Sequence, residues 1–323
     1  MTRSSDTPHL PLVILAGSDP EPAALPAEGA ALHPLKGAKA ISVTVDHKPI
    51  LDVLLERLRA SGYFAPIYIA GPAKLLGQRH EGAEVVDTDG ALGENLRAAV
   101  EHVMQQHASG PVAITTCDIL PELDDLDTVM TDYHAYAPLD LWFPVIQAPT
   151  DKRLGASSWK PRYRLIAEGS DEAASMLPGH LVIADPWAFR LPLIYRSFQL
   201  AYETRNTPVM RRLWRILGGV LVGLVAADFR DLVRLRLPAK TATAVYHGIA
   251  LALELRGEAR QASLEKRLRG IFVRHRHRRQ NRQLGGRIPL MQALSLAKDI
   301  DTQEEADEAG RRLRRRFLRR KKT

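Results

Sequence analysis

The chain has 323 residues, of which 45% are hydrophobic and 25% charged, as is ordinary for a soluble globular protein. Its only cysteine, Cys117, excludes a disulfide framework and is typical of a reducing cytoplasm. No stretch reaches the roughly 20 apolar residues that a membrane span requires, and we expect no signal peptide in the polar residues 1–10.

The net charge of +8 is unevenly distributed. Residues 240–323 hold 22 Lys/Arg against 9 Asp/Glu, a net of +13, whereas the remaining 239 residues hold 23 against 28, a net of −5. The basic character therefore belongs to the C-terminal part of the chain and not to the whole surface.

Over the first 185 residues, short apolar runs alternate with segments whose apolar residues have helical spacing. We expect strands at residues 12–15, 67–70, 85–86, 112–115, 141–145 and 181–184, and helices at 50–60 and 92–106. We read residues 186–270 as mainly helical, 274–282 as a basic cluster, and Gly310 onwards as an arginine-rich helix or a disordered tail. Strands that alternate with helices predict a mostly parallel α/β sheet.

Three polar or glycine-containing segments follow predicted strands, and ligands of parallel sheets bind beyond the carboxyl ends of the strands. They are Ala16-Gly17-Ser18, Asp118, and the pair Asp87 and Asp89. Asp118 and the distant tetrapeptide Asp299-Ile300-Asp301-Thr302 suggest a divalent-metal site, because Mg²⁺ needs only one or two carboxylates beside phosphate oxygens. Alternatively, Asp118 caps a helix after Pro121, and Asp301 opens a capping box.

The order of these elements resembles the nucleotidyltransferases with a molybdenum-cofactor-guanylyltransferase-like (MobA-like) domain. The resemblance rests on Leu15-Ala16-Gly17, Lys39, Lys48-Pro49-Ile50-Leu51, Asp118 and Asp299-Ile300-Asp301-Thr302. It implies a GT-A-like, Rossmann-like α/β fold with helices on both faces of a mostly parallel sheet, plus a helical insertion. The implied division is a disordered lead (1–10), a nucleotidyltransferase core (11–185), a mainly helical insertion (186–284), a return to the core (285–309) and a basic tail (310–323).

The resemblance also implies roles for individual residues. Leu15, Ala16 and Gly17 match the start of the glycine-rich signature whose backbone amides hold the triphosphate. Lys39 matches the signature's lysine, which stabilises charge as the α-phosphate is attacked, although Lys36 is an alternative match. Lys48-Pro49 matches the family's entry to the first helix.

Further along the chain, Gly90, Gly93, Asn95 and Leu96 match the segment beside the nucleobase and ribose. Asp118 matches the first metal-binding aspartate, and Asp301 matches the second. The family's cofactor is Mg²⁺. Its substrates imply a nucleoside triphosphate as donor and a phosphorylated small molecule or lipid head group as acceptor, with release of pyrophosphate.

The chain departs from the family pattern in two places. After Gly17 it reads Ser18-Asp19-Pro20-Glu21-Pro22, without the signature's second glycine and arginine. Prolines lack N–H donors and acids repel phosphate, so this loop cannot cradle a triphosphate in the usual way. His47 replaces the glycine that precedes Lys48.

Two alternatives remain open. A GT-A-type glycosyltransferase would use Asp87-Thr88-Asp89 for its metal, and a non-catalytic nucleotide-binding relative would account for the altered loop.

We expect a cytoplasmic protein with possible peripheral contact of its basic C-terminal region with an anionic membrane, aided by the apolar stretch 216–227. Nucleic acid is not an expected partner, because no aromatic residues interleave with the arginines. We interpret His275 and His277 as part of a solvated basic face.

Overall fold

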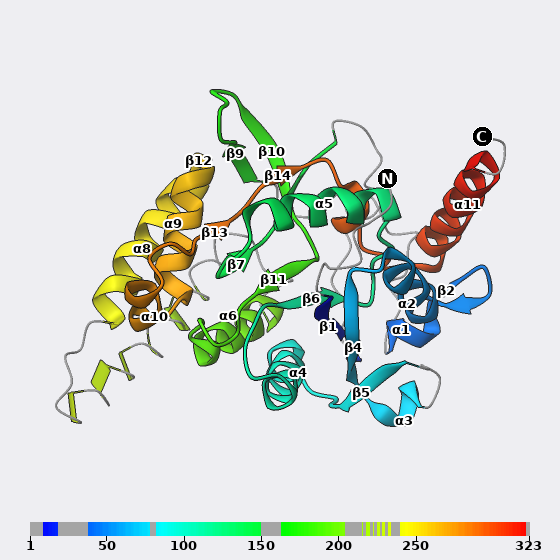
Figure 1. Cartoon of the computed structure of the whole chain (residues 1–323), viewed down its shortest axis with the longest axis horizontal. Coiled ribbons are helices and arrows are strands. Elements are labelled where there is room, and N and C mark those ends of the chain that lie inside the picture. Colours follow the sequence, from blue (N-terminus) through cyan, green and yellow to red (C-terminus); the bar gives the residue numbers. More distant parts are fainter. Residues whose placement is uncertain are drawn as a thin grey trace.

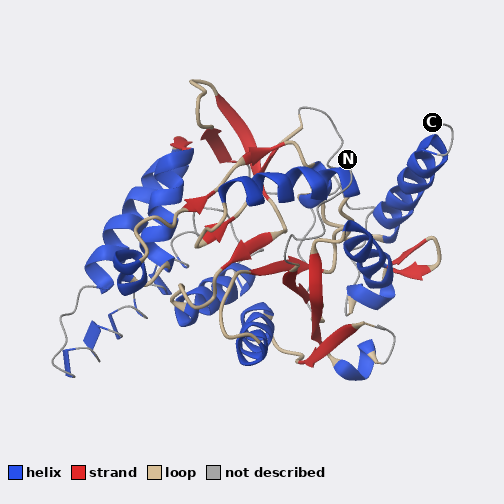
Figure 2. Ribbon diagram, in the orientation of Figure 1, coloured by secondary structure: helices blue, strands red, loops and turns tan. Residues whose placement is uncertain are grey.

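A computed structural model describes residues 9–18, 38–77, 82–149, 163–203 and 240–320, together with scattered positions between 215 and 233. Figures 1 and 2 show strands at the centre with helices on either side. The strands form a seven-stranded sheet, a five-stranded sheet and a two-stranded hairpin. The fold is therefore mixed α/β with one large, mostly parallel, Rossmann-like sheet, as the alternation of strands and helices predicts.

The order of the large sheet is β13 (Gly286–Arg287), β7 (Leu141–Trp142), β11 (Val182–Ala184), β6 (Val112–Thr116), β1 (Leu10–Leu15), β4 (Phe64–Gly71) and β5 (Ala83–Asp87). Strand β1 pairs in parallel with both β4 and β6. Strand β11 alone runs antiparallel to its two neighbours, β6 and β7, among the pairings of this sheet. The start of β11 therefore lies at the same edge as the end of β6.

Helices cover both faces of the large sheet. They are α1 (Lys39–Ser42), α2 (Ile50–Ser61), α3 (Ala73–Leu76), α4 (Leu92–Gln106), α5 (Leu123–Tyr136) and α6 (Leu191–Glu203). On one face, Leu12 and Ile14 pack in a core cluster with residues of α2 and α5. On the other face, Val13 and Leu15 pack with residues of α4 and α6. Because side chains alternate across β1, this strand is buried from both sides, which explains its unbroken apolar run.

The ends of α2 and α4 follow local sequence signals. Helix α2 ends at Ser61, and Gly62 takes a left-handed conformation with φ 68°, as expected for a helix C-cap. The bounds of α4 coincide with the predicted helix 92–106. Before α2, the strands β2 (Thr44–Val45) and β3 (Lys48–Pro49) are joined by Asp46 and His47, both with positive φ. His47 thus occupies a backbone conformation that favours glycine.

The predicted strand 141–145 is wrong as a single element. The chain forms β7 (Leu141–Trp142) in the large sheet and β8 (Val145–Gln147) in the smaller one. The break falls at Phe143-Pro144, and Pro144 has no backbone N–H to donate to a ladder. Its carbonyl oxygen instead accepts a hydrogen bond from the Gly179 amide at 3.0 Å.

The smaller sheet has the order β12 (Glu258–Arg260), β9 (Tyr163–Ile166), β10 (Ala173–Pro178), β8 and β14 (Leu290–Met291). Helices α8 (Lys240–Arg256) and α9 (Gln261–Phe272) contribute leucines to the apolar cluster beside it. The region expected to be mainly helical therefore also contains β12. After β14, the chain continues through the short helix η3 (Leu294–Leu296) to α11 (Gln303–Arg320), which is helical throughout.

Helix α10 (His275–Gln280) lies within the basic cluster expected to be solvated. That interpretation is wrong for His277. Its Nε2 lies 2.9 Å from the carboxylate of Asp140, which is 0% exposed and also accepts a hydrogen bond from Arg269 Nε at 2.6 Å. Asp140 precedes β7, so this buried network ties α9 and α10 to the large sheet.

Among the helices that the structure describes, none combines the length and the apolarity needed to cross a membrane. Most of the apolar stretch 216–227 lies outside the described residues, and the positions within it that are described are helical.

Candidate functional site

The candidate site lies where the carboxyl end of β6 meets the start of β11 and the segment before α11. Asp118 follows β6 in a turn, and its carbonyl oxygen accepts a hydrogen bond from the Ile300 amide at 2.7 Å. The His180 amide donates to the Leu296 carbonyl at 2.7 Å. These backbone bonds hold three distant segments of the chain together, so the structure does bring Asp118 close to the tetrapeptide that begins at Asp299.

Asp118, His180 and Asp299 form a group suited to a metal ion. One potential ligand atom from each lies within 4.8 Å of the others. His180 Nε2 lies 2.7 Å from Asp299 Oδ1, and Nδ1 of the same ring lies 3.1 Å from Thr116 Oγ1. The Thr116 contact fixes the orientation of the ring, as an outer-shell partner does in metal sites.

Asp118 adds a second sign that this group holds a cation. Its Oδ1 atom is buried and has no hydrogen-bond partner within the part of the chain that the structure describes. A buried, unpartnered carboxylate oxygen is costly, because it has lost its water without gaining a donor. A divalent cation with oxygen ligands would satisfy it, so the residues fit such an ion.

Asp301 lies next to this group but makes a different contact. Lys39 Nζ, at the start of α1, donates a hydrogen bond to Asp301 Oδ1 at 2.6 Å, and the two side chains are only 14% and 11% exposed. The group of possible metal ligands in the structure therefore contains Asp299 with Asp118 and His180, whereas Asp301 lies nearby and pairs with Lys39. Cation binding by Asp301 stays a prediction, whereas its pairing with Lys39 is observed.

The two partners of this ion pair both titrate higher than usual. Burial opposes the charge of Lys39, but the carboxylates of Asp301, Asp118 and Asp299 outweigh it and raise the lysine pKa above its ordinary value. Burial also raises the pKa of Asp301, and Asp299 and Asp118 add to this effect against the opposing charge of Lys39. A pair alone would lower the pKa of the aspartate, so the upward direction reflects burial first and the two neighbouring carboxylates second.

The charges of the site also fit a divalent cation. Three carboxylates (Asp118, Asp299 and Asp301) against one ammonium (Lys39) leave a formal charge of −2 on these four side chains. A charge of −2 in a largely buried site is stabilised by a divalent cation.

Helix capping does not use the aspartates of the site. The cap of α11 is Thr302, whose Oγ1 accepts a hydrogen bond from the Glu305 amide at 3.2 Å, while Glu305 Oε2 accepts one from the Asp301 amide at 2.9 Å. The alternative that Asp301 opens the capping box is therefore off by one residue. The alternative for Asp118 is also wrong, because the N-cap position of α5 is occupied by Glu122, four residues further on.

Gly17, Gly90 and Asn95 meet at the end of β1. The Asn95 side chain accepts hydrogen bonds from the Gly90 amide at 2.9 Å and Thr88 Oγ1 at 2.8 Å, and donates one to the Gly90 carbonyl at 2.8 Å. A Cβ atom at Gly17 would overlap the Asn95 amide group. The glycine thus allows the end of β1 to approach the loop before α4 closely.

Other residues expected to bind nucleotide make contacts within the fold. The Ala16 amide donates to the Ala70 carbonyl at 2.8 Å, and the Leu15 carbonyl accepts from the Cys117 amide at 3.1 Å. Gly93 faces α6, where a Cβ atom would lie 2.6 Å from the Tyr195 carbonyl oxygen. Nucleotide binding by Leu15, Ala16, Gly17, Gly90, Gly93 and Asn95 stays a prediction. Residues 19–37, including the altered loop and Lys36, lie outside the described residues.

No sequence signal was used to predict His180 as a site residue, and Asp299 was predicted only as part of the tetrapeptide, without a role as a metal ligand of its own. The signal for His180 was its position directly before the predicted strand 181–184. This position is informative only when the direction of the strand is known. The first residue of an antiparallel strand lies at the edge where the neighbouring parallel strands have their carboxyl ends.

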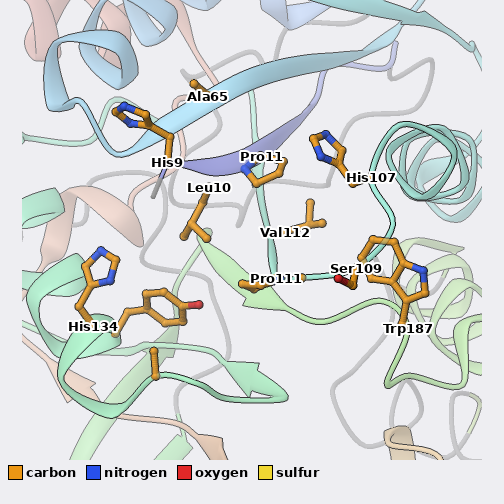
Figure 3. A pocket seen from close by; sticks show the side chains of 13 residues that line it. His9, Leu10, Pro11, Ala65, His107, Ser109, Pro111, Val112, His134 and Trp187 are labelled. Carbon is orange, nitrogen blue, oxygen red and sulfur yellow. The ribbon is translucent and has the colours of Figure 1, made fainter. Parts of the chain in front are cut away.

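A cavity of about 350 Å³ lies at the opposite edge of the large sheet. Figure 3 shows Leu10 and Val112, the first residues of β1 and β6, among the side chains that line it, with His9, His107 and His134 spaced around it. Because it opens at the amino ends of the strands, this cavity is separate from the candidate site.

Comparison with known proteins gives a match in fold. No family model matches this chain, and no curated protein does. A solved structure described as a hypothetical transferase from Thermus thermophilus is 20% identical, covers 92% of this chain and 99% of its own, and has a TM-score of 0.52. The similarity identifies the fold.

Two further structures resemble parts of the chain. One is a CMP:2-keto-3-deoxy-manno-octonic acid synthetase complexed with CTP, 14% identical over 64% of this chain and 86% of that one, with a TM-score of 0.41. The other is HddC from Yersinia pseudotuberculosis complexed with GMP-PN, 12% identical over 58% of this chain and 79% of that one, with a TM-score of 0.38. At these scores neither carries an argument about this chain.

Replacing Lys39 by Met leaves Asp301 buried beside two carboxylates without its cation. We expect the free energy of unfolding in metal-free buffer to fall by about 2–4 kcal/mol, because an uncompensated buried charge is costly. Lys48→Met is a matched control, since Lys48 Nζ also lies 2.6 Å from a carboxylate, that of Glu56, but the two side chains are 57% and 58% exposed. The control should change the free energy of unfolding far less, because solvent screens an exposed ion pair. Equal losses in urea denaturation would contradict the role of burial.

Proposed function

We propose that the protein is a nucleotidyltransferase that transfers a nucleotidyl group from a nucleoside triphosphate to a phosphorylated small molecule or a lipid head group and releases pyrophosphate. The observation that carries the proposal is the convergence of Asp118, His180 and Asp299 with the buried Lys39 at the carboxyl edge of a mostly parallel sheet. In sheets of this kind, ligands bind at that edge.

Asp118 and Asp299, with His180, would hold the cation, for which we propose Mg²⁺. A cation bound there supplies charge neutralisation and orientation of the triphosphate oxygens. Asp118 Oδ1 is the ligand atom with the clearest need of a partner, because it is buried and makes no hydrogen bond to any residue that the structure describes.

Lys39 would stabilise charge on the α-phosphate. Lys39 stays protonated at neutral pH, because the three neighbouring carboxylates raise its pKa. An acceptor phosphate oxygen attacks the α-phosphorus, the bond from that phosphorus to the bridging oxygen breaks, and the electron pair leaves with pyrophosphate. The attacking phosphate is already ionised, so no general base is required, and binding, positioning and electrostatics carry the reaction.

The geometry does not favour the glycosyltransferase alternative. Asp87 Oδ1 accepts a hydrogen bond from the Ala73 amide at 2.8 Å, at the first residue of α3. Asp89 Oδ1 accepts one from Ser18 Oγ at 2.5 Å. The two carboxylates thus have separate partners, and neither belongs to the group formed by Asp118, His180 and Asp299.

The direct test is pyrophosphate release from each of the four nucleoside triphosphates, with Mg²⁺ and a panel of phosphomonoesters. The panel contains a sugar 1-phosphate, glycerol phosphate and phosphatidic acid, which separates small-molecule from lipid acceptors. We expect pyrophosphate in the presence of one nucleotide and one acceptor class. Turnover of a nucleotide-sugar without pyrophosphate would support a glycosyltransferase instead, and nucleotide binding without turnover would support the non-catalytic alternative.

His180 adds a nitrogen donor, and imidazole suits transition metals better than it suits Mg²⁺. We expect His180→Ala to weaken Mn²⁺ binding about tenfold and Mg²⁺ binding much less. Electron paramagnetic resonance of Mn²⁺, with Mg²⁺ as competitor, measures both affinities. His102→Ala is the control, since His102 Nε2 also lies close to a carboxylate, 2.8 Å from Glu84 Oε1, away from the site. An equal loss for both cations would show that His180 only positions Asp299.

A further inference from the structure

The mainly helical region between α6 and α9 exposes apolar side chains on one helical face. Val222, Val225, Phe229, Leu232 and Val233 are 51–71% exposed. The described positions around them are helical, and the spacings of three, four, three and one residues place all five side chains on one side of a helix. Single exposed apolar residues are common on protein surfaces, but a stripe along one face marks an interaction site.

Helix α8 carries a second stripe of the same kind. Tyr246, Ile249 and Leu253 are 57–64% exposed and again follow helical spacing. The helix also packs inwards, because Leu251 and Leu255 join the apolar cluster beneath the smaller sheet. The helix is therefore apolar on both sides, and in the part of the chain that the structure describes only one side is packed in a core cluster. We refer to the eight exposed residues of the two stripes as the apolar face.

A basic side chain lies against the α8 part of the apolar face, and further cations follow on α9 and α10. Arg267 lies with its guanidinium carbon 5.2 Å from the centre of the Tyr246 ring, and hydrogen bonding and charge from Arg267 lower the pKa of Tyr246. Between residues 256 and 282 the sequence holds ten Lys/Arg against two Asp/Glu. Several of these cations are exposed on α9, α10 and their flanks, namely Arg256, Arg260, Lys266, Arg274, Arg276, Arg279 and Arg282.

We infer that the apolar face and these cations form a docking surface for an anionic lipid bilayer, with the helices lying in the plane of the interface. Apolar side chains would insert at the boundary between head groups and acyl chains, and the cations would contact anionic head groups.

Charge favours a bilayer over a second copy of the chain. In a symmetric dimer the same patch occurs on both partners, so the cations of one copy would face the cations of the other. Like charges brought together at an interface cost free energy, whereas an anionic surface attracts each of them. Figure 1 shows α8 at the end of the molecule opposite to α11, so this end could lie on a flat surface without involving α11.

The test is sedimentation of the full-length protein with vesicles of phosphatidylcholine alone and of phosphatidylcholine with about 30% phosphatidylserine. We expect binding to the anionic vesicles that is at least about tenfold stronger and that weakens as salt is added. Equal binding to both kinds of vesicle, or none, would overturn the inference. This comparison uses only the wild-type protein.

Variants locate the surface. Ile249→Gln with Leu253→Gln should weaken binding at least about tenfold, because the inserted apolar area is lost. Leu75→Gln is the control, since Leu75 is an apolar residue of α3 that is 50% exposed and lies away from α8.

Lys266→Gln with Arg267→Gln should weaken binding to anionic vesicles only, and Arg97→Gln on α4 is the control for charge. Unchanged binding in the first double variant, or an equal loss in Leu75→Gln, would contradict the placement.

This inference goes beyond nucleotidyl transfer and does not depend on it. Vesicle binding is measured without nucleotide, and Asp118→Ala should bind vesicles as well as wild type does. Failure of pyrophosphate release with intact vesicle binding would count against the proposed function alone. The inference would be overturned if the protein did not bind vesicles but formed dimers that the Ile249 and Leu253 substitutions abolish. A second copy of the chain would then cover the apolar face.

Discussion

Replacing Asp118 by Ala should lower pyrophosphate release at least about 1000-fold, equivalent to about 4 kcal/mol of transition-state stabilisation. The carboxylate has a buried oxygen that no described residue hydrogen-bonds, and it lies with His180 and Asp299 in the group that would hold the cation. Its loss removes a ligand from a cation that neutralises phosphate charge. Steady-state pyrophosphate release, with the nucleotide and acceptor that wild type uses, measures the effect.

The same substitution should not destabilise the protein when metal is absent. Asp118 raises the pKa of Asp301, so removing it relieves repulsion between carboxylates. We expect the melting temperature of Asp118→Ala in chelator to equal or exceed that of wild type, as is common for residues kept for function.

Asp87→Ala is a suitable control for Asp118→Ala. Its carboxylate accepts the Ala73 amide at the start of α3, so its loss should cost about 1 kcal/mol of stability with little loss of activity. If Asp87→Ala abolished turnover and Asp118→Ala did not, the metal would be bound by the Asp-x-Asp segment, against our account.

Replacing Asp140 by Ala should lower the stability of the fold strongly. Asp140 is 0% exposed and holds Arg269 of α9 and His277 of α10. Asp140→Ala leaves the partly buried guanidinium of Arg269 without its carboxylate, and we expect the free energy of unfolding to fall by about 3 kcal/mol. Urea denaturation at neutral pH measures it.

The matched control for Asp140→Ala is Glu101→Ala. Glu101 Oε1 lies 2.9 Å from Arg97 Nε in an exposed pair on α4, and its loss should change stability by less than about 0.5 kcal/mol. Similar losses in the two variants would show that the Asp140 network contributes no more than a surface ion pair does.

Local signals in the sequence predicted many of the elements. The apolar spacing of residues 50–60 with Ser61-Gly62 after it marked α2, and residues 92–106 marked α4, because both helices have strong periodicity. The break between β7 and β8 was missed because the apolar residues continue through Phe143-Pro144. Only tertiary structure shows that the chain passes from one sheet to the other at this point.

The place of the site was predictable from the sequence, but the presence of His180 and Asp299 beside Asp118 was not. Asp118 and the tetrapeptide at 299–302 were expected to meet, and they do. The sequence could not tell Asp299 from Asp301, because the two flank Ile300 and the choice depends on where Lys39 lies. His180 required the antiparallel direction of β11, which apolar periodicity does not reveal.

The measurement that tests the central claim most directly is thermal melting of wild type and Asp118→Ala with Mg²⁺ and each of the four nucleoside triphosphates. A nucleotide present at 100 times its dissociation constant adds about 2.7 kcal/mol to the stability of the folded state. We predict that one nucleotide raises the melting temperature of wild type by several degrees, only when Mg²⁺ is present, and that Asp118→Ala loses this shift. No shift with any nucleotide, or a shift that the variant retains in full, would contradict a metal-nucleotide site at Asp118.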